Sequence, residues 1–220
     1  MKVTPQRLRK HLDKHRVPYA LVPGYDSARI DPYNGRSDFV GVLLHHTAGT
    51  NSLNYIVNTN PYAPVRACHF LVQRDGVVQV VSAVGAYHAG AGGPVKFTPT
   101  VTVPKDSGNS RLYGIEIESL GTSAKIDGKP AGMTDNQVIS TAKLCAALLD
   151  AMRRGPLPYK AGRVIRHRDW TPRKIDTRQD LNWWQQAVRI AAKHHGDPAV
   201  ANAKLREFLK ANPNGTLTAP

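Results

Sequence analysis

Two histidines each follow a short apolar run, and an aspartate lies a little beyond the second one. His45 follows residues 40–44, which read Val-Gly-Val-Leu-Leu, and His167 follows residues 164–166, which read Val-Ile-Arg. Asp176 comes nine residues after His167. Two neutral imidazoles and one carboxylate that leave a fourth position for water form the ligand set of a catalytic zinc site. The spacing is not a short, regular metal motif, so by itself it also fits ordinary histidines at strand ends.

The elements that would position these residues are buried strands. A strand covered on both faces has a continuous Val/Leu/Ile sequence, so the residue at its end lies where a rigid scaffold meets solvent. Residues 112–118 predict a further strand, in which Glu116 and Glu118 share one face. In a mixed sheet, one of these acids could project to the same rim as His45 and His167. A solvated strand face is the alternative for this acidic pair.

Other patterns predict a hairpin and two helices. Residues 68–81 form two β-rich runs around an Asp-Gly turn, which is typical of a β-hairpin. A capping box at residues 134–137 opens a helix whose apolar side chains repeat at helical spacing. A last helix starts at Asp180 or Asn182 and runs to about residue 193.

These elements predict an α/β fold with a central mixed β-sheet flanked by helices. Residues 1–37 are expected to form a peripheral N-terminal helix, over residues 4–15, and a lead-in loop that packs on the domain. Residues 38–195 would form the main domain. Residues 196–220 are rich in Ala, Lys and Pro, which predicts a C-terminal tail or linker with a small helix near residues 204–210.

A formal net charge of +14 is the strongest signal in the composition. It favours a polyanionic partner, such as nucleic acid, an anionic membrane or a bacterial wall rich in acidic polymers. No recognition-helix pattern, RNP motif or zinc-finger spacing accompanies the basic residues, so charge alone supports nucleic acid. No apolar run is long enough to cross a bilayer, and the N-terminus lacks the apolar segment of an export signal.

Two further pairs of side chains could carry chemistry. His11 and His15 are four residues apart on the N-terminal helix, a spacing that can bind metal. We assign them to a solvated face, because neither a third ligand nor a glutamate base accompanies them. Cys68 and Cys145 allow one disulfide that the sequence neither requires nor excludes. A buried free thiol is the default for both.

Five stretches of the chain, in this order, resemble the zinc-dependent N-acetylmuramoyl-L-alanine amidases of the amidase-2 type, which share their fold with peptidoglycan recognition proteins. The matching stretches are residues 44–49 (LHHTAG), 69–76 (HFLVQRDG), 87–90 (YHAG), 114–118 (GIEIE) and 167–176 (HRDWTPRKID). The resemblance implies the amidase-2 fold for the main domain, with the mixed sheet and flanking helices expected above.

By this resemblance His45, His167 and Asp176 are the ligands of a zinc ion. Glu116 matches the acid that members of the intracellular-amidase type use as catalytic base. Lys174 matches a lysine that such enzymes place beside the metal. We expect four more residues of the same stretches to contact substrate: His46, Thr47, His69 and His88.

Two places in the chain depart from the family pattern. Cys68 stands where some phage members have a catalytic tyrosine, which favours the version of the site in which Glu116 moves the proton. Thr177 and Arg178 follow the third ligand where many members have Pro-Gly, which leaves the shape of that loop open.

The implied activity is hydrolysis of the amide bond between N-acetylmuramic acid and L-alanine in bacterial peptidoglycan. Zinc would acidify water and polarise the carbonyl, Glu116 would deliver a proton to the leaving amine, and Lys174 would stabilise the oxyanion. The basic charge and the N-terminal sequence suit a monomeric phage endolysin that stays in the host cytoplasm until a holin-type protein releases it to the wall. Peptidoglycan would be its partner, without nucleic acid and without stable membrane insertion.

Two other functions compete with this one. The alternative is a non-catalytic peptidoglycan-binding module of the same fold; such modules typically lack a zinc ligand, whereas the full set is present here. The third hypothesis is a basic nucleic-acid-binding protein, which predicts salt-dependent DNA retention without a metal requirement.

Overall fold

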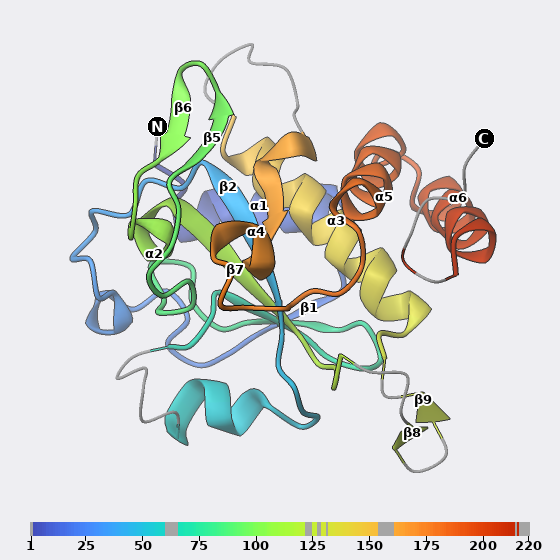
Figure 1. Cartoon of the computed structure of the whole chain (residues 1–220), viewed down its shortest axis with the longest axis horizontal. Helices are drawn as coiled ribbons and strands as arrows, with labels where there is room; N and C mark the ends of the chain where they lie inside the picture. The colour runs from blue at the N-terminus through green and yellow to red at the C-terminus, as the bar shows by residue number, and fades with distance from the viewer. Residues whose placement is uncertain are drawn as a thin grey trace.

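A six-stranded mixed sheet lies at the centre of the computed structural model, with the strand order β1-β4-β3-β7-β2-β10 (Figure 1). The structure describes residues 2–59, 66–121, 125–126, 129–130, 132–153, 161–213 and 215. The strands of the sheet are β1 (Tyr19–Leu21), β2 (Gly41–His46), β3 (Phe70–Val72), β4 (Val78–Val80), β7 (Leu112–Ile117) and β10 (Val164–Arg166). Two small hairpins lie outside it: β5 (Val95–Thr98) with β6 (Val101–Val103), and β8 (Lys125–Ile126) with β9 (Lys129–Pro130).

The middle of the sheet is parallel and fixes which residues share an edge. β2 pairs in parallel with β7 on one side and with β10 on the other. The register sets His45 of β2 directly opposite Glu116 of β7, and Arg166, the last residue of β10, opposite Leu44. Because parallel neighbours end at the same edge, the segment that follows β10 starts beside His45. β3 and β4 are antiparallel, which confirms the predicted hairpin.

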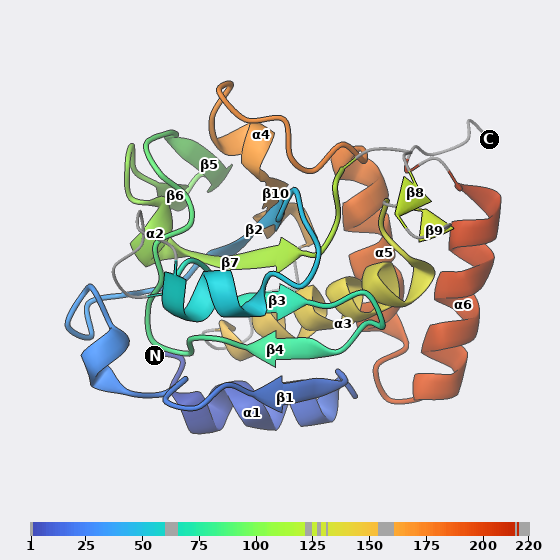
Figure 2. The same cartoon turned by 90° about the horizontal axis from the view of Figure 1, so that it is seen from below.

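Helices cover the sheet on the side of α3. This helix runs along one face of the sheet, with α1, α5 and α6 packed against it (Figures 1 and 2). The helices are α1 (Pro5–Lys14), α2 (Gly108–Arg111), α3 (Asp135–Ala151), α4 (His167–Trp170), α5 (Leu181–Lys193) and α6 (Pro198–Ala211). Single turns occur at Ala28–Ile30, Tyr55–Thr59 and Ala161–Arg163. This arrangement confirms the predicted α/β fold with a central mixed sheet flanked by helices.

The helix α3 is the centre of the main hydrophobic core. All of its residues from Gln137 to Ala151 are buried, as a helix packed on every side requires. Its predicted capping box is present: Thr134 Oγ1 accepts a hydrogen bond from the Gln137 amide at 3.2 Å, and Gln137 Oε1 accepts one from the Thr134 amide at 2.9 Å. The predicted start of this helix is therefore confirmed.

Two segments differ from the prediction. Residues 17–37, expected to be a loop, contain β1, an edge strand that pairs in parallel with β4. The small helix expected near residues 204–210 is present but longer: it spans Pro198–Ala211, and its Leu205 and Phe208 are buried in the main core. The large apolar side chains of this helix are widely spaced among Ala and Lys, so the sequence alone does not show that they share one face of the helix.

The pair His11 and His15 takes part in an ion-pair cluster between α1 and α3. Both imidazoles contact Oδ2 of Asp150 at 3.2 Å, and the same oxygen accepts a hydrogen bond from Lys14 Nζ at 2.7 Å. The expected solvated face is wrong for His15, which is buried. The spacing of four residues serves to bind one carboxylate.

Cys68 and Cys145 are both buried free thiols. Burial raises the pKa of each thiol, which keeps both protonated and unreactive at neutral pH. Among the helices that the structure describes, none has the length and apolar character needed to cross a bilayer.

Candidate metal centre

His45, His167 and Asp176 converge on one point. Nδ1 of His45 lies 2.9 Å from Nδ1 of His167, and Oδ2 of Asp176 lies 3.0 Å from the latter and 3.5 Å from the former. All three side chains are buried. Within the described residues they form the one group of His, Cys, Asp and Glu whose ligand atoms are close enough to share a cation. Tetrahedral zinc holds its ligand atoms roughly 3.3 Å apart, so these three need only small shifts.

Local structure explains why the three residues meet. His45 lies near the end of β2, and His167 opens α4 directly after β10, the neighbour of β2. The loop after α4 then folds back, because the amide of Arg168 donates a hydrogen bond to the carbonyl oxygen of Asp176 at 2.9 Å. This turn returns Asp176 to the start of α4 and aims its carboxylate at both imidazoles.

Hydrogen bonds on the far side of each imidazole fix which nitrogen carries the proton. Nε2 of His167 donates to the carbonyl oxygen of Ala89 at 3.2 Å. Nε2 of His88 donates to the carbonyl oxygen of Leu112 at 3.0 Å, so Nδ1 of His88 is an acceptor. Nε2 of His45 donates to that Nδ1 at 3.1 Å. In the neutral form of His45 and of His167, the Nδ1 atom therefore keeps a free electron pair.

The centre thus brings together three atoms that can each donate an electron pair to a cation. Two imidazole nitrogens and a carboxylate oxygen at these separations repel each other unless a cation lies between them. Neutral imidazoles oriented by hydrogen bonds from behind are typical of metal sites. The residues present therefore fit a zinc ion, which these three side chains would hold.

Burial and mutual interactions favour the protonation states that metal binding needs. Burial lowers the pKa of His45 to about 4, and the interaction with Asp176 opposes this only in part. Burial alone would raise the pKa of Asp176, but its interactions with His167 and His45 outweigh that effect and hold the pKa below the usual range. At neutral pH, His45 is neutral and Asp176 is ionised, as metal ligands must be.

Glu116 reaches the centre from the neighbouring strand. Its Oε2 atom is buried and has no hydrogen-bond partner among the described residues. Burial, and next the charge of Asp176, raise the pKa of Glu116 to about 8, while the charge of Lys174 lowers it. Lys174 is exposed in the loop between α4 and Asp176, and its charge also lowers the pKa of His45. Glu116 and Lys174 therefore both interact electrostatically with residues of the candidate centre.

Three of the residues expected to contact substrate lie around this centre. His46 follows His45 directly, but its side chain points to the opposite face of β2 and lines a cavity on the side of α3. The Thr47 hydroxyl donates a hydrogen bond to a backbone carbonyl of its own loop at 2.6 Å and so stabilises that loop. His69 is fully buried, and its Nδ1 accepts a hydrogen bond from the amide of Gly114 at 3.0 Å.

The fourth, His88, lies behind His45, with both ring nitrogens engaged in the hydrogen bonds described above. Gly114 makes this position possible, because a Cβ atom there would lie only 2.3–2.7 Å from the atoms of the His88 ring. His88 and the next residue, Ala89, accept hydrogen bonds from His45 and His167, respectively. Sequence reasoning missed this orienting role, although the Tyr-His-Ala-Gly stretch supplies both partners.

Comparisons with known proteins agree with the geometry. The chain matches the Amidase_2 family (N-acetylmuramoyl-L-alanine amidase) over residues 35–179. No curated protein gives a significant match.

Similar solved structures include AmpDH3 from Pseudomonas aeruginosa, at 21% identity and a TM-score of 0.49; the alignment covers 73% of this chain and 61% of that chain. AmpDH3 in complex with an anhydromuramic pentapeptide aligns at 19% identity and a TM-score of 0.48, over 80% of this chain and 75% of that chain. PlyL aligns at 15% identity and a TM-score of 0.47, over 78% of this chain and 96% of that chain. The family match extends over well more than half of the sequence and includes all three residues that meet at the centre, so the chain belongs to the Amidase_2 family of N-acetylmuramoyl-L-alanine amidases.

Proposed function

We propose that the protein is a zinc-dependent enzyme that hydrolyses the amide bond between N-acetylmuramic acid and L-alanine in peptidoglycan. The observation that carries the proposal is the meeting of His45 Nδ1, His167 Nδ1 and Asp176 Oδ2 within 3.5 Å of one another. Family membership supports the class of bond. When bound by these three residues, zinc would supply the acidification of water and the polarisation of the scissile carbonyl.

Glu116 carries the proton in this mechanism. It takes a proton from the attacking water and delivers it to the nitrogen of the leaving L-alanine. Two observations support this role: Glu116 lies opposite His45 in the sheet, and its pKa is raised to about 8, close to the pH at which it must both accept and release a proton. Its unpartnered Oε2 is free to contact the reacting groups.

Lys174 stabilises the negative charge that develops on the carbonyl oxygen. Its loop position leaves the ammonium group exposed to an incoming substrate, while its charge still acts on His45 and Glu116. A preorganised donor at such an oxygen lowers the barrier by about 3 kcal/mol.

The biological role that we propose is lysis of a bacterial host by a phage. The protein would act as a monomer, remain in the host cytoplasm until a holin-type protein releases it, and then bind the peptidoglycan of the wall. The net charge of +14 supports retention on an anionic wall.

Metal analysis combined with product analysis tests the activity. We expect about one zinc ion per chain, lost in His167→Ala, and digestion of cell walls that yields free amino groups of L-alanine without new reducing sugars. Bound zinc without any new amino terminus would favour the non-catalytic peptidoglycan-binding module. Cleavage of a glycosidic bond or of a cross-bridge would refute the proposal.

A further inference from the structure

Asp176 lies at the end of an exposed stretch of the chain. Residues 172–175 are exposed, whereas Asp176 and the next residue, Thr177, are buried. An exposed stretch has few packing contacts and opens easily, so it cannot by itself hold a ligand in place. The position of the Asp176 carboxylate therefore depends on the residues that flank this stretch on either side.

Thr177, which directly follows Asp176, makes the first flanking contact. Its Oγ1 atom accepts a hydrogen bond of 2.9 Å from Nε1 of Trp184. Both side chains are fully buried, and Trp184 belongs to the main hydrophobic core. A buried indole N–H without an acceptor is unfavourable, so this bond fastens the residue after the ligand to α5.

Arg166, the residue before His167, makes the second flanking contact. Its Nε and Nη2 atoms donate to the two carboxylate oxygens of Asp169 at 2.8 and 2.7 Å, and its Nη1 atom donates to the carbonyl oxygen of Gln179 at 2.8 Å. A guanidinium bound to both oxygens of a carboxylate has a fixed direction, so its remaining donor binds Gln179 at a defined place. Arg166 thus joins the two ends of the segment that carries His167 and Asp176.

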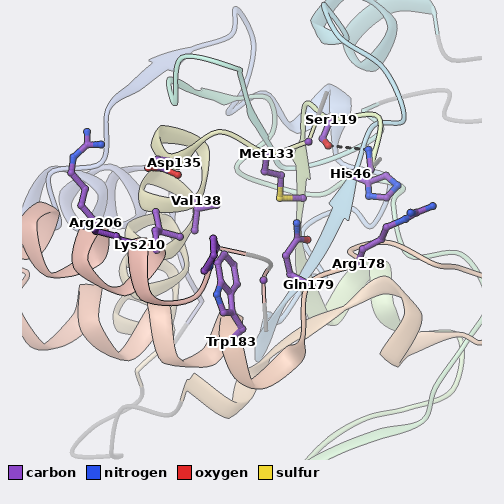
Figure 3. Close-up of a pocket in the computed structure, with 15 residues that line it drawn as sticks. His46, Ser119, Met133, Asp135, Val138, Arg178, Gln179, Trp183, Arg206 and Lys210 are labelled. Carbon is purple, nitrogen blue, oxygen red and sulfur yellow. Dashed lines mark hydrogen bonds between the residues drawn. The ribbon is translucent and has the colours of Figure 1, made fainter. Parts of the chain in front are cut away.

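The part of the chain after the ligand leads directly into α5. Figure 3 shows Gln179 between His46 of β2 and Trp183 in the first turn of α5. The helix α5 packs against α3, the centre of the main core. The carbonyl oxygen of Gln179 and the indole of Trp184 therefore belong to a well-packed part of the domain, and the two flanking contacts connect the ligand loop to it.

We propose that Arg166 and Thr177 are positioning residues for the third metal ligand, which together hold the Asp176 carboxylate against the two imidazoles. Both act through the backbone on either side of the ligand. Thr177 is one of the two residues after Asp176 that depart from the family pattern, so its hydroxyl supplies a support that this pattern does not predict. The inference rests on the proposed zinc-dependent function, because it concerns the affinity of the centre for its metal.

The test compares matched pairs of variants. Thr177→Val removes the hydroxyl group and keeps the shape of the side chain, whereas Thr177→Ser keeps the hydroxyl group. Arg166→Met removes the guanidinium group. Its control is Arg168→Met, because Arg168 is an exposed residue of the same segment whose side chain makes no hydrogen bond within the described part of the chain. Thermal unfolding of the metal-free proteins shows that each variant is folded.

We expect the affinity for zinc, measured by competition with a chelator, to fall about tenfold in Thr177→Val and in Arg166→Met and to stay unchanged in the two controls. Cobalt bound in place of zinc gives a second readout, because its visible absorption depends on the number and geometry of its ligands. Displacement of Asp176 should change this spectrum in Thr177→Val and Arg166→Met, whereas a contact that only supports folding would leave it unchanged.

Wild-type zinc affinity and an unchanged cobalt spectrum in either of these two variants would overturn the positioning role of that residue, whatever its thermal stability. These measurements do not depend on catalysis. A wild-type protein that binds zinc but leaves cell walls intact would therefore refute the amidase proposal and not this inference, and a wild-type protein that binds no zinc would refute both.

Discussion

Replacement of His88 by leucine tests how the centre is held. His88→Leu removes the acceptor of the hydrogen bond from His45 Nε2 and keeps an apolar side chain against Gly114. Without this bond, the proton of His45 can move to Nδ1, the atom that faces the other two ligands. A proton on Nδ1 blocks metal binding, so the affinity for zinc should fall.

The geometry sets the expected size of the effect. Loss of a hydrogen-bonded partner behind a ligand histidine costs about 10- to 100-fold in metal affinity. The bond from His45 to His88 measures 3.1 Å and continues through a bond of 3.0 Å from His88 to the carbonyl oxygen of Leu112. Because His45 is buried, water has little access to replace the lost partner. We therefore expect a loss of about 50-fold, or roughly 2.3 kcal/mol.

Competition with a chromophoric zinc chelator at pH 7 measures this affinity, and thermal unfolding of the metal-free protein reports on folding. In His88→Asn the amide oxygen takes the place of Nδ1, so this variant should recover much of the affinity. His69→Asn is the control, because His69 is also buried and lies beside His88, yet it contacts none of the three ligands. A folded His88→Leu protein with the zinc affinity of the wild type would refute the orienting role.

Three more predictions concern charge and protonation. Lys174→Ala should lower kcat by about 100-fold with unchanged zinc content, because the ammonium group acts on the oxyanion and does not bind the metal. Loss of zinc in elemental analysis would contradict this prediction. The metal-free protein should lose stability as the pH falls from 6.5 towards 4, because burial lowers the pKa of His15 to about 4 and that of His69 to about 3, so the unfolded chain takes up protons that the folded chain does not. In that pH range, each of these two imidazoles lowers the free energy of unfolding by about 1.4 kcal/mol for each unit of falling pH. Urea midpoints that do not vary with pH would exclude the effect. Asp150→Ala should lower the free energy of unfolding by about 2 kcal/mol, since Lys14 and two histidines lose their shared acceptor. An unchanged urea midpoint would show that the cluster adds no stability.

The sequence predicts the centre of the fold well because local patterns and strand order determine it. Val/Leu-rich runs that end in histidine identify β2 and β10, and alternation identifies β7 with Glu116. Parallel pairing then brings the ends of these strands to one edge, where the structure finds His45, His167 and Asp176 together.

The parts that the sequence does not predict depend on contacts between distant segments. β1 has three residues and lies at the edge of the sheet, so it has too little length to show a pattern. The role of His88 depends on its close approach to Gly114 across β7, which no spacing reveals. The cavity that His46 lines forms only when α6 packs against α3 and α5, and its positive charge is scattered along the sequence in Arg178, Arg206 and Lys210.

The position of β10 has a consequence for durability. This strand has three residues, lies at the border of the sheet next to β2, and leads straight into His167, which is 122 residues away from His45. An ion bound by both imidazoles would link β10 to β2. Because the ion would bind the folded chain only, its binding would raise the free energy of unfolding. Resistance to digestion by proteases would then follow the local supply of zinc, so chelation would shorten the lifetime of the molecule as well as stop its turnover.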